Sequence, residues 1–342
     1  MIGVFSMNLF PLTRALIDID STTGREREAG DFLFRYLEDL VQTSGGAVER
    51  MPVEGDRFNV FARWGEPVVV LSTHMDTVPP FFPSSEDDEF IHGRGACDTK
   101  GGIAAMLQAA RELLEEGVRG FGLLFVVGEE TDSLGAQVAN RHPGGSRYLI
   151  NGEPTGNRLA LGSKGYLYIR IEAEGRAAHS AYPELGESAI DRLLEVLARL
   201  RALTLPADPV LGETTLNIGT LAGGRAANVV ADQARAEVTV RTVGAAGDLK
   251  RRISEAVHAV PGVRIAEIRE TPAVQLGSLP GFATTIVKYT TDIPRLGAWG
   301  EPFLLGPGSI HVAHTPEERI AKRDLLDAAR HYRDMVRQLR DR

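Results

Sequence analysis

Apolar strand patterns alternate with helix patterns in the first half of the chain, and this alternation constrains the fold more than any other feature. Residues 68–76 (VVVLSTHMD), 121–127 (FGLLFVV) and 148–150 (YLI) are short, mostly apolar runs. Such runs are typical of strands that are buried on both faces. Residues 101–115 (GGIAAMLQAARELLE) lie between the first two runs and have the apolar spacing of a helix. The sequence therefore predicts an α/β domain with a mainly parallel sheet and helices on both faces.

A different pattern begins near residue 163. Residues 165–175 (GYLYIRIEAEG) alternate apolar and polar side chains, as in a strand with one solvent-exposed face. A helix is expected at 187–203, two strands around a turn at 223–228, a second helix at 248–260 and a last strand at 263–270. This β-α-β-β-α-β order predicts a two-layer, ferredoxin-like domain at residues 163–273, inserted into a larger domain of residues 1–162 and 274–342. Ligands bind preferentially in the cleft that such an insertion creates.

The composition excludes several classes of protein. The 342 residues carry a net charge of 38 − 46 = −8 and are 43% hydrophobic, as in a soluble globular protein. This balance provides no basic surface for nucleic acid or an anionic membrane. No apolar run reaches the roughly 18–20 residues that span a bilayer, and residues 1–12 lack the features of a signal peptide. Because a single cysteine fits a reducing compartment, we expect a cytoplasmic protein.

Residues that commonly bind metals follow the predicted strands. They are His74 and Asp76, Asp98 in GRGACDTKGG, Glu129 and Glu130, Glu153 in NGEPT, and His314 before the last helix. The carboxyl ends of parallel strands meet at one edge of a sheet, where the functional crevice lies. Each residue alone is more often an ordinary surface or core side chain. Their coincidence in five segments is what favours a shared site.

Two histidines with several carboxylates suit zinc, cobalt or manganese. A pair of such ions about 3.5–4 Å apart needs one bridging carboxylate and further ligands on each side. Other chemistries are less consistent with the sequence. The glycines near Asp98 lack the order of a P-loop or of a dinucleotide fingerprint, and no G-x-S-x-G nucleophile motif is present.

Five motifs in this order resemble the M20 metallopeptidase and amidohydrolase family: STHMDTVPP, GRGACDTKGG, GEET, NGEPT and GPGSIHVAHTPEE. The similarity covers nearly the whole chain and includes the inserted domain. It implies two bound divalent metal ions, with zinc expected and cobalt or manganese as alternatives. His74 and Glu153 would hold one metal, Glu130 and His314 the other, and Asp98 would bridge both.

The resemblance also implies the acid–base residues. Asp76 would orient the His74 imidazole from behind, and Glu129 would be the general base that takes a proton from the attacking water and delivers it to the leaving amine. His311 competes with His314 as a ligand, but His314 stands in the A-H-T-P-x-E pattern of the family.

Four further residues resemble substrate-binding residues of the family. His179 in AAHSAYP would reach the active site of a partner subunit and stabilise the tetrahedral oxyanion. Arg241 in EVTVRTV would bind the α-carboxylate of the substrate, and Asn228 in GGRAANVV would help to position it. Thr290 in YTTDIPRL takes the place of the threonine in a G-T-S-D segment.

The resemblance therefore implies a metal-dependent hydrolase with a lid domain that also forms a homodimer. The GPG loop and the H-T-P-E-E ending resemble the acetylornithine deacetylase and succinyl-diaminopimelate desuccinylase branch, so we expect the substrate to be an N-acyl amino acid. Two alternatives remain open: a dipeptidase or carboxypeptidase that acts on small peptides, and a metal-binding module that has lost catalysis.

Overall fold

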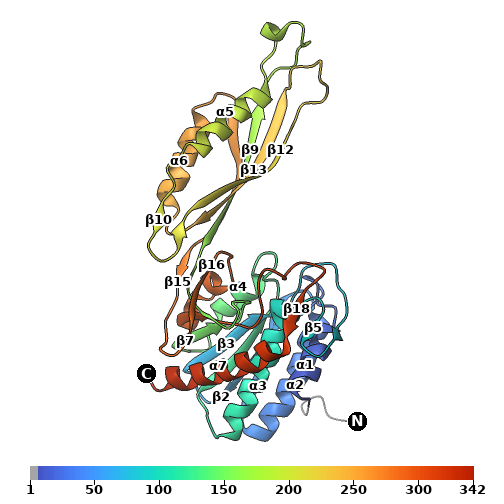
Figure 1. The fold of residues 1–342 in the computed structure, drawn as a ribbon, viewed down its shortest axis with the longest axis vertical. Coiled ribbons are helices and arrows are strands. Elements are labelled where there is room, and N and C mark those ends of the chain that lie inside the picture. Colours follow the sequence, from blue (N-terminus) through green and yellow to red (C-terminus); the bar gives the residue numbers. More distant parts are fainter. Residues whose placement is uncertain (1–6) are drawn as a thin grey trace. The chain divides into compact units, whose positions relative to one another are not determined.

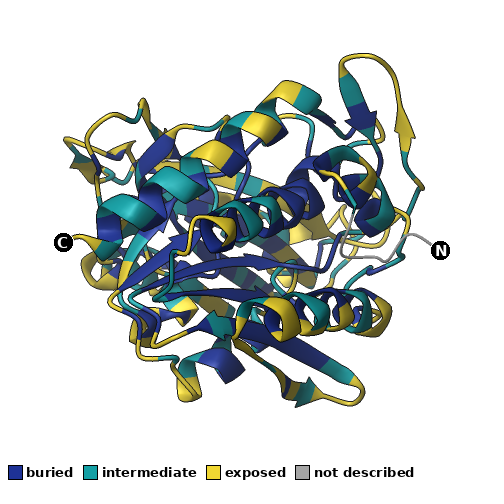
Figure 2. Cartoon of the chain, turned by 90° about the horizontal axis from the view of Figure 1, so that it is seen from below, coloured by how far each residue is buried: buried dark blue, intermediate teal, exposed yellow. Residues whose placement is uncertain are grey.

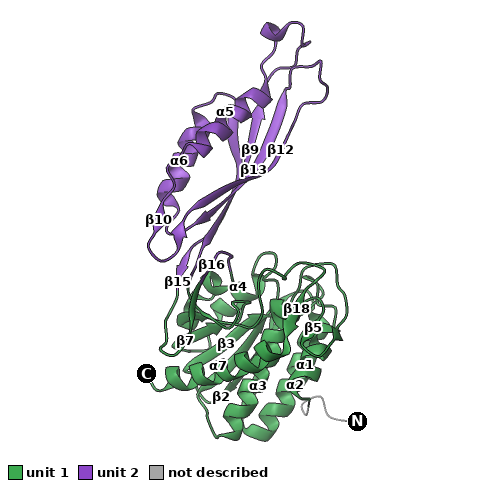
Figure 3. Ribbon diagram, viewed as in Figure 1, with its two compact units in different colours: residues 1–161, 276–285, 291–342 green, residues 162–275, 286–290 purple. Residues whose placement is uncertain are grey.

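The computed structural model describes residues 7–342, which divide into two compact units (Figure 3). The first unit contains the chain up to Leu161 together with Leu276–Thr285 and Thr291–Arg342. The second contains Gly162–Gln275 and Ile286–Thr290. The short segment 286–290 thus groups with the second unit, although the chain has by then returned to the first.

The centre of the first unit is a six-stranded sheet in the order β1-β2-β6-β3-β7-β17 (Figure 1). Its strands are β1 Ala47–Glu54, β2 Arg57–Trp64, β3 Val69–His74, β6 Phe121–Val126, β7 Tyr148–Asn151 and β17 Glu301–Leu304. β6, β3, β7 and β17 are parallel, whereas β1 and β2 form an antiparallel edge. The unit is a mixed α/β fold with a mostly parallel central sheet. The antiparallel edge was not predicted.

Helices cover both faces of this sheet. They are α1 Leu9–Ile17, α2 Arg27–Ser44, α3 Gly101–Glu115, α4 Leu134–Arg141 and α7 Lys322–Arg340. Successive side chains of a strand point to opposite faces. Leu123 and Phe125 of β6 pack in one core with α1, α2, α3 and α7, whereas Leu124 and Val126 pack in another with α4. All residues of β3 and β6 are buried, which explains the apolar runs in the sequence. Figure 2 shows dark blue strands and helix faces inside the molecule, with yellow mostly in the loops and on outer helix faces.

The described chain starts just before α1. The expectation that the N-terminal residues form no signal peptide concerns residues 1–12, of which residues 1–6 lie outside the described part. Within residues 7–342, no helix combines the length and the apolar character needed to cross a membrane.

Two three-stranded sheets are present among the described residues, besides the central sheet and those of the second unit. β4 Ser85–Glu86, β5 Phe90–His92 and β18 Arg319–Ala321 pair in the order β18-β5-β4. Because Arg319 lies opposite His92 in this sheet, the segment that follows His314 runs beside the segment that leads to Asp98. β8 Leu159–Ser163, β15 Val274–Gln275 and β16 Thr284–Val287 form the other sheet, in the part of the chain that passes from one unit to the other.

Apart from the two-residue strands β10 and β11, the second unit has the β-α-β-β-α-β order that the sequence pattern predicts. Its elements are β9 Gly165–Glu174, α5 Ala189–Arg201, β10 Ala207–Asp208, β11 Gly212–Glu213, β12 Thr215–Gly223, β13 Gln233–Thr242, α6 Gly247–His258 and β14 Val263–Thr271. The four long strands form an antiparallel sheet in the order β12-β13-β9-β14. α5 and α6 pack on one face of this sheet around Ile169, Leu193 and Ile253. The other face is polar and carries Arg241.

Candidate metal centre

The Asp98 carboxylate lies between two histidines that are far apart in the sequence. Its Oδ1 is 3.1 Å from Nε2 of His74, the last residue of β3. Its Oδ2 is 3.2 Å from Nε2 of His314, which lies in the loop before β18. Asp98 stands in the short turn Ala96–Lys100 that leads into α3. Because each oxygen faces a different imidazole, Asp98 has the geometry of a ligand shared by two metal ions.

Glu130 and Glu153 lie beside the two histidines. Glu130 Oε1 is 3.1 Å from Nε2 of His314, and Glu153 Oε1 is 3.9 Å from Nε2 of His74. One ligand atom each of His74, Asp98 and Glu130 lie within 4.8 Å of one another. Glu153 Oε1 is buried and has no hydrogen-bond partner among the described residues. Burying an unpaired carboxylate oxygen is costly, so this atom fits a cation.

Asp76 organises the backbone behind these ligands. Its Oδ1 accepts the N–H of Glu129 at 3.1 Å, and its Oδ2 accepts the N–H of Glu130 at 3.2 Å. The Thr23 hydroxyl also donates to Oδ2, at 2.8 Å. His74 Nδ1 lies 3.0 Å from the Asp76 carbonyl oxygen and 3.5 Å from Oδ1 of its carboxylate. Asp76 therefore contacts both the imidazole and the loop after β6, and its backbone carbonyl is the nearer partner of the ring.

The electrostatics of the cluster favour bound cations. Burial raises the pKa of Glu129 and of Glu153 well above the usual range, and neighbouring carboxylates raise both further. Burial opposes ionisation of Asp98, but hydrogen bonds with the histidines hold its pKa below the usual range. Burial alone would lower the pKa of His74, yet hydrogen bonds with Asp76 and Asp98 raise it well above its ordinary value. Cations would relieve the repulsion among these buried carboxylates.

Asp292 was not singled out in the sequence. It is 1% exposed, and within the described chain neither of its carboxylate oxygens has a partner in hydrogen-bond geometry. Burial raises its pKa to about 7, and its charge contributes to the raised pKa of Glu129 and of Glu153. Asp292 could have been found from the segment YTTDIPRL, in which only Thr290 was considered as a candidate site residue.

The four candidate substrate-binding residues, His179, Asn228, Arg241 and Thr290, lie in the second unit. Two of them, His179 and Asn228, lie on neighbouring segments. The N–H of Ser180, the residue after His179, donates to the carbonyl of Asn228 at 3.0 Å. Both His179 and Asn228 are exposed. Because His179 Nδ1 accepts the N–H of Ala181 at 3.1 Å, the nitrogen left to donate is Nε2.

Arg241 is half-buried on β13, with its guanidinium 4.9 Å from the centre of the Tyr166 ring. Burial lowers its pKa. On the same face of the sheet, Arg170 and Arg269 pair with Glu267 at 3.1 Å and 3.0 Å. Among the described residues, Arg241 has no such carboxylate partner. A desolvated guanidinium of this kind can bind a carboxylate through its planar fork.

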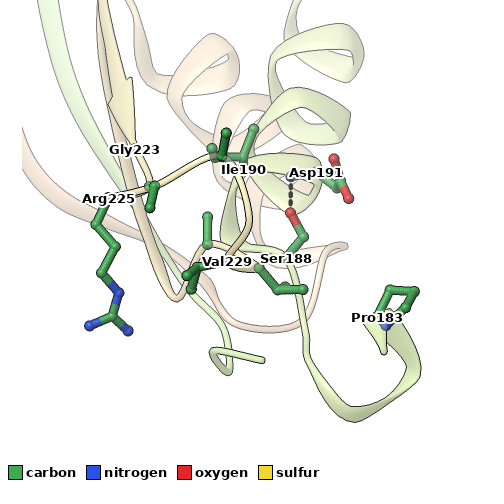
Figure 4. A pocket seen from close by; sticks show the side chains of 12 residues that line it. Pro183, Ser188, Ile190, Asp191, Gly223, Arg225 and Val229 are labelled. Carbon is green, nitrogen blue, oxygen red and sulfur yellow. Dashed lines mark hydrogen bonds between the residues drawn. The ribbon is translucent and has the colours of Figure 1, made fainter. Parts of the chain in front are cut away.

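A hollow of about 680 Å³ is also present in the second unit, between the start of α5 and the β12–β13 loop (Figure 4). Ser188 lines it and caps α5 by accepting the N–H of Asp191 at 3.1 Å. The other lining residues are mostly small and apolar, and none of the four candidate substrate-binding residues is among them. We assign it no ligand.

A cluster of two histidines and several carboxylates, in which His74 is buried and His314 is exposed, is typical of metal-dependent hydrolases. The particular family follows from comparison with known proteins. The model of the peptidase family M20/M25/M40 matches residues 70–338, so the chain belongs to this family. It is therefore a metal-dependent hydrolase, as the five motifs predicted.

Curated relatives agree with this assignment. The chain is 40% identical over 343 residues to a peptidase M20 domain-containing protein of Schizosaccharomyces pombe, with 96% of this chain and 84% of the relative covered. It is 39% identical over 369 residues to a probable carboxypeptidase of Aspergillus terreus, with 94% of this chain and 84% of the relative covered.

Solved structures have the same fold. A tripeptidase of Staphylococcus aureus has a TM-score of 0.81 at 21% identity and covers 98% of both chains. A dinuclear metal-binding peptidase of the M20 family from Bacillus subtilis has a TM-score of 0.69 at 16% identity, with 97% of both chains covered. This chain also contains a group of residues, His74, Asp98 and Glu130, that could hold a metal ion.

Proposed function

We propose that the chain is a dinuclear metal-dependent peptidase that removes C-terminal residues from short peptides. The observation that carries the proposal is the Asp98 carboxylate with a histidine at each oxygen, inside a group of further carboxylates. The name of the Aspergillus terreus relative, a probable carboxypeptidase, supports a peptide substrate. An N-acyl amino acid presents the same amide bond next to a free carboxylate. Deacylation is therefore the second candidate, with the H-T-P-E-E ending in its favour.

The ligands divide into two sets around Asp98. His74 and Glu153 would hold one ion, and Glu130 and His314 the other. The short distances from Asp98 to both histidines support the shared role, and the unpartnered Oε1 of Glu153 supports a cation on the His74 side. Zinc suits a set of imidazoles and carboxylates, as do cobalt and manganese.

Glu129 would act as the general base and then as the general acid. Two bound divalent ions would polarise the scissile carbonyl and lower the pKa of a water molecule at the site. Glu129 would take the proton of the attacking water and deliver it to the leaving nitrogen. Burial raises the pKa of Glu129, which supports this role because it makes the carboxylate a stronger base. Asp76 would hold Glu129 through its backbone N–H.

The second unit would recognise the substrate. Arg241 would bind the free α-carboxylate, and Asn228 and Thr290 would position the backbone of the substrate. His179 would donate from Nε2 to the oxyanion that forms on the carbonyl carbon of the scissile bond, since a donor aimed at developing charge is a large catalytic contribution. The exposure of His179 supports a role that needs a group outside its own unit.

We also propose that two copies of the chain assemble through the second unit. β12 pairs only with β13 and is the edge of its sheet, and most of its residues are exposed. An exposed edge strand offers unpaired backbone groups to another chain. In a dimer of this kind, His179 would act in the partner's active site. A cytoplasmic location belongs to the same proposal, on the ground of the single cysteine.

A substrate panel tests the proposed activity. It contains di- and tripeptides with free C-termini, the same peptides with C-terminal amides, and N-acetyl and N-succinyl amino acids, with zinc, cobalt or manganese supplied. We expect release of the C-terminal residue from free peptides, no turnover of the amides, and loss of activity in Glu129→Gln. Turnover of N-acyl amino acids alone would establish the deacylase. No turnover of any substrate on the panel, by a chain with two metals bound, would contradict both candidate activities.

Metal content tests the ligand assignment separately. We expect two metal ions per wild-type chain and one in His314→Ala, measured by elemental analysis after gel filtration. His311→Ala is the matched control, because His311 is an exposed histidine in the same loop and should leave both ions bound. Full occupancy in His314→Ala would remove His314 from the ligand set.

A further inference from the structure

A buried ion pair lies directly behind the Asp98 backbone. Glu318 is 1% exposed and Arg94 is 2% exposed. Arg94 Nη1 donates to Glu318 Oε2 at 2.5 Å. The other carboxylate oxygen, Oε1, accepts the backbone N–H groups of Cys97 at 3.3 Å and of Asp98 at 3.2 Å. A single carboxylate therefore holds both peptide groups that lead into the candidate bridging ligand.

The same pair connects three loops of the candidate site. Glu318 follows closely after His314 in the chain, and its carbonyl accepts the N–H of Gly93 at 3.1 Å. Arg94 stands in the glycine-rich loop, and its Nε donates to the carbonyl of Pro80 at 3.2 Å, in the loop that follows β3. A shift of one of these loops would thus be transmitted to the other two.

Arg94 also makes the position of Glu318 electrostatically possible. The region already contains several carboxylates, and an unpaired charge behind Asp98 would add to their repulsion. Paired with Arg94, the Glu318 carboxylate can accept two N–H groups while the pair adds no net charge. Hydrogen bonds to an ionised acceptor are stronger than those between neutral groups, so this arrangement restrains the backbone firmly.

The geometry points to Glu318 and Arg94 as positioning residues, which fix the backbone of Asp98 so that its two carboxylate oxygens face two different metal ions. This inference rests on the proposed dinuclear site. Because Asp98 would be shared, a displaced backbone should weaken both metals together. Loss of a ligand on one side, as in His314→Ala, should remove one ion only.

Two variants separate the hydrogen bonds from the charge. Glu318→Asp keeps the charge but shortens the side chain by one methylene, which withdraws the carboxylate from the two N–H groups. The double substitution of Arg94→Gln with Glu318→Gln removes both charges but keeps an amide oxygen that can accept from the same groups. Glu112→Asp is the matched control, because it shortens a carboxylate that pairs with Arg333 at 2.9 Å between α3 and α7.

The measurements are titrations of the metal-free full-length chain with Zn²⁺ and Co²⁺, the visible spectrum of the Co²⁺ form, and thermal unfolding without metal. We expect Glu318→Asp to weaken both metals by about 10–100-fold and to change the Co²⁺ spectrum, as loss of a group behind a ligand does elsewhere. The double Gln variant and Glu112→Asp should bind both ions with affinity close to that of the wild type.

Several results would overturn the inference. Wild-type affinity in Glu318→Asp, even with a lower melting temperature, would assign the pair a purely structural role. Weaker binding in the double Gln variant, with wild-type affinity in Glu318→Asp, would show that the charge matters and the accepted hydrogen bonds do not. Equal weakening in both would show that any change at this buried pair disturbs the metals, which contradicts a specific role of the two accepted hydrogen bonds. Loss of one metal alone would contradict an effect through the shared Asp98. A wild-type chain that binds no metal would instead contradict the proposed function itself.

Discussion

Most candidate functional residues of the first unit are buried, whereas none of those of the second unit is; His314 of the first unit is exposed, and Arg241 of the second is half-buried. In the first unit, His74, Asp76 and Asp98 are 1%, 0% and 6% exposed, and each is hydrogen-bonded to another residue of the cluster or its loops. In the second unit, His179 and Asn228 are exposed on loops. The first arrangement is organised before any ligand arrives. The proposed roles of the residues in the second unit depend on a ligand or on a second chain.

This contrast has a physical basis in the two sheets. The strands β3 and β6 of the first unit are buried on both faces, so the residues at their carboxyl ends emerge from a rigid, desolvated layer. The sheet of the second unit has helices on one face only, and its polar face is open to ligands. We therefore expect substitutions in the first unit to affect chemistry or metal binding. Those in the second should affect substrate recognition or the stabilisation of the oxyanion.

The largest effect is expected from Glu129→Gln. The amide cannot accept a proton from water, so kcat should fall by about 10²–10⁴-fold. Both metals should stay bound, because the candidate ligands are unchanged, and elemental analysis of the assayed sample checks this. A near-native kcat with two ions bound would remove Glu129 as the base and weaken the view that the first unit holds the chemistry.

His179→Ala is expected to reduce kcat/KM by about a hundredfold or more, because it removes one donor to the oxyanion. The metal content should not change. His258→Ala is the control, because His258 is an exposed histidine on α6 of the same unit, and its ring lies 3.1 Å from the Ser254 hydroxyl. If kcat/KM falls no further in His179→Ala than in this control, His179 has no catalytic role. The contrast between the two units would then lose its main support.

Arg241→Ala should raise KM for substrates with a free carboxylate and leave kcat nearly unchanged, because binding of the carboxylate contributes equally before and during the reaction. A hydrogen bond to a charged group contributes about 1.5–3 kcal/mol, which corresponds to about 10–100-fold in KM. Arg235→Ala is the matched control on the same strand and the same face of the sheet. If both variants behave alike, the exposed face acts through its general charge and Arg241 has no specific role.

Much of the first unit could be predicted because its signals are local. The apolar run at 68–76 gave β3, and the helix expected at 101–115 is α3 Gly101–Glu115. The candidate ligands stand beside these elements in the sequence. The pattern that predicts the strands and the helix therefore also predicts which residues meet at the edge of the sheet. β1 was not predicted, because it is mostly exposed and has no apolar run.

Other features were not predictable because they depend on tertiary contacts between distant segments. Asp292 is buried near Glu129 only because its segment returns to the first unit after the second. Arg94 and Glu318 pair across more than two hundred residues of sequence, through the pairing of β18 with β5. Nothing in the composition of either segment indicates such a partner. Whether Arg241, Asn228, His179 and Thr290 bind substrate depends on a ligand and a second chain, so their roles stay predictions.

The smallest effect is expected from Ser188→Ala, and it tests whether the two units are independent. The Ser188 hydroxyl accepts the N–H of Asp191 at the start of α5, and loss of such a cap costs about 1 kcal/mol of stability. We expect this loss in the denaturant unfolding of the second unit, with unchanged affinity for Co²⁺ in the first. Ser254→Ala on α6, where the hydroxyl contacts only the His258 ring 3.1 Å away, is the control and should cost less than about 0.5 kcal/mol. A lower affinity for Co²⁺ in Ser188→Ala would mean that the two units unfold together. The metal centre of the first unit would then depend on the stability of the second unit.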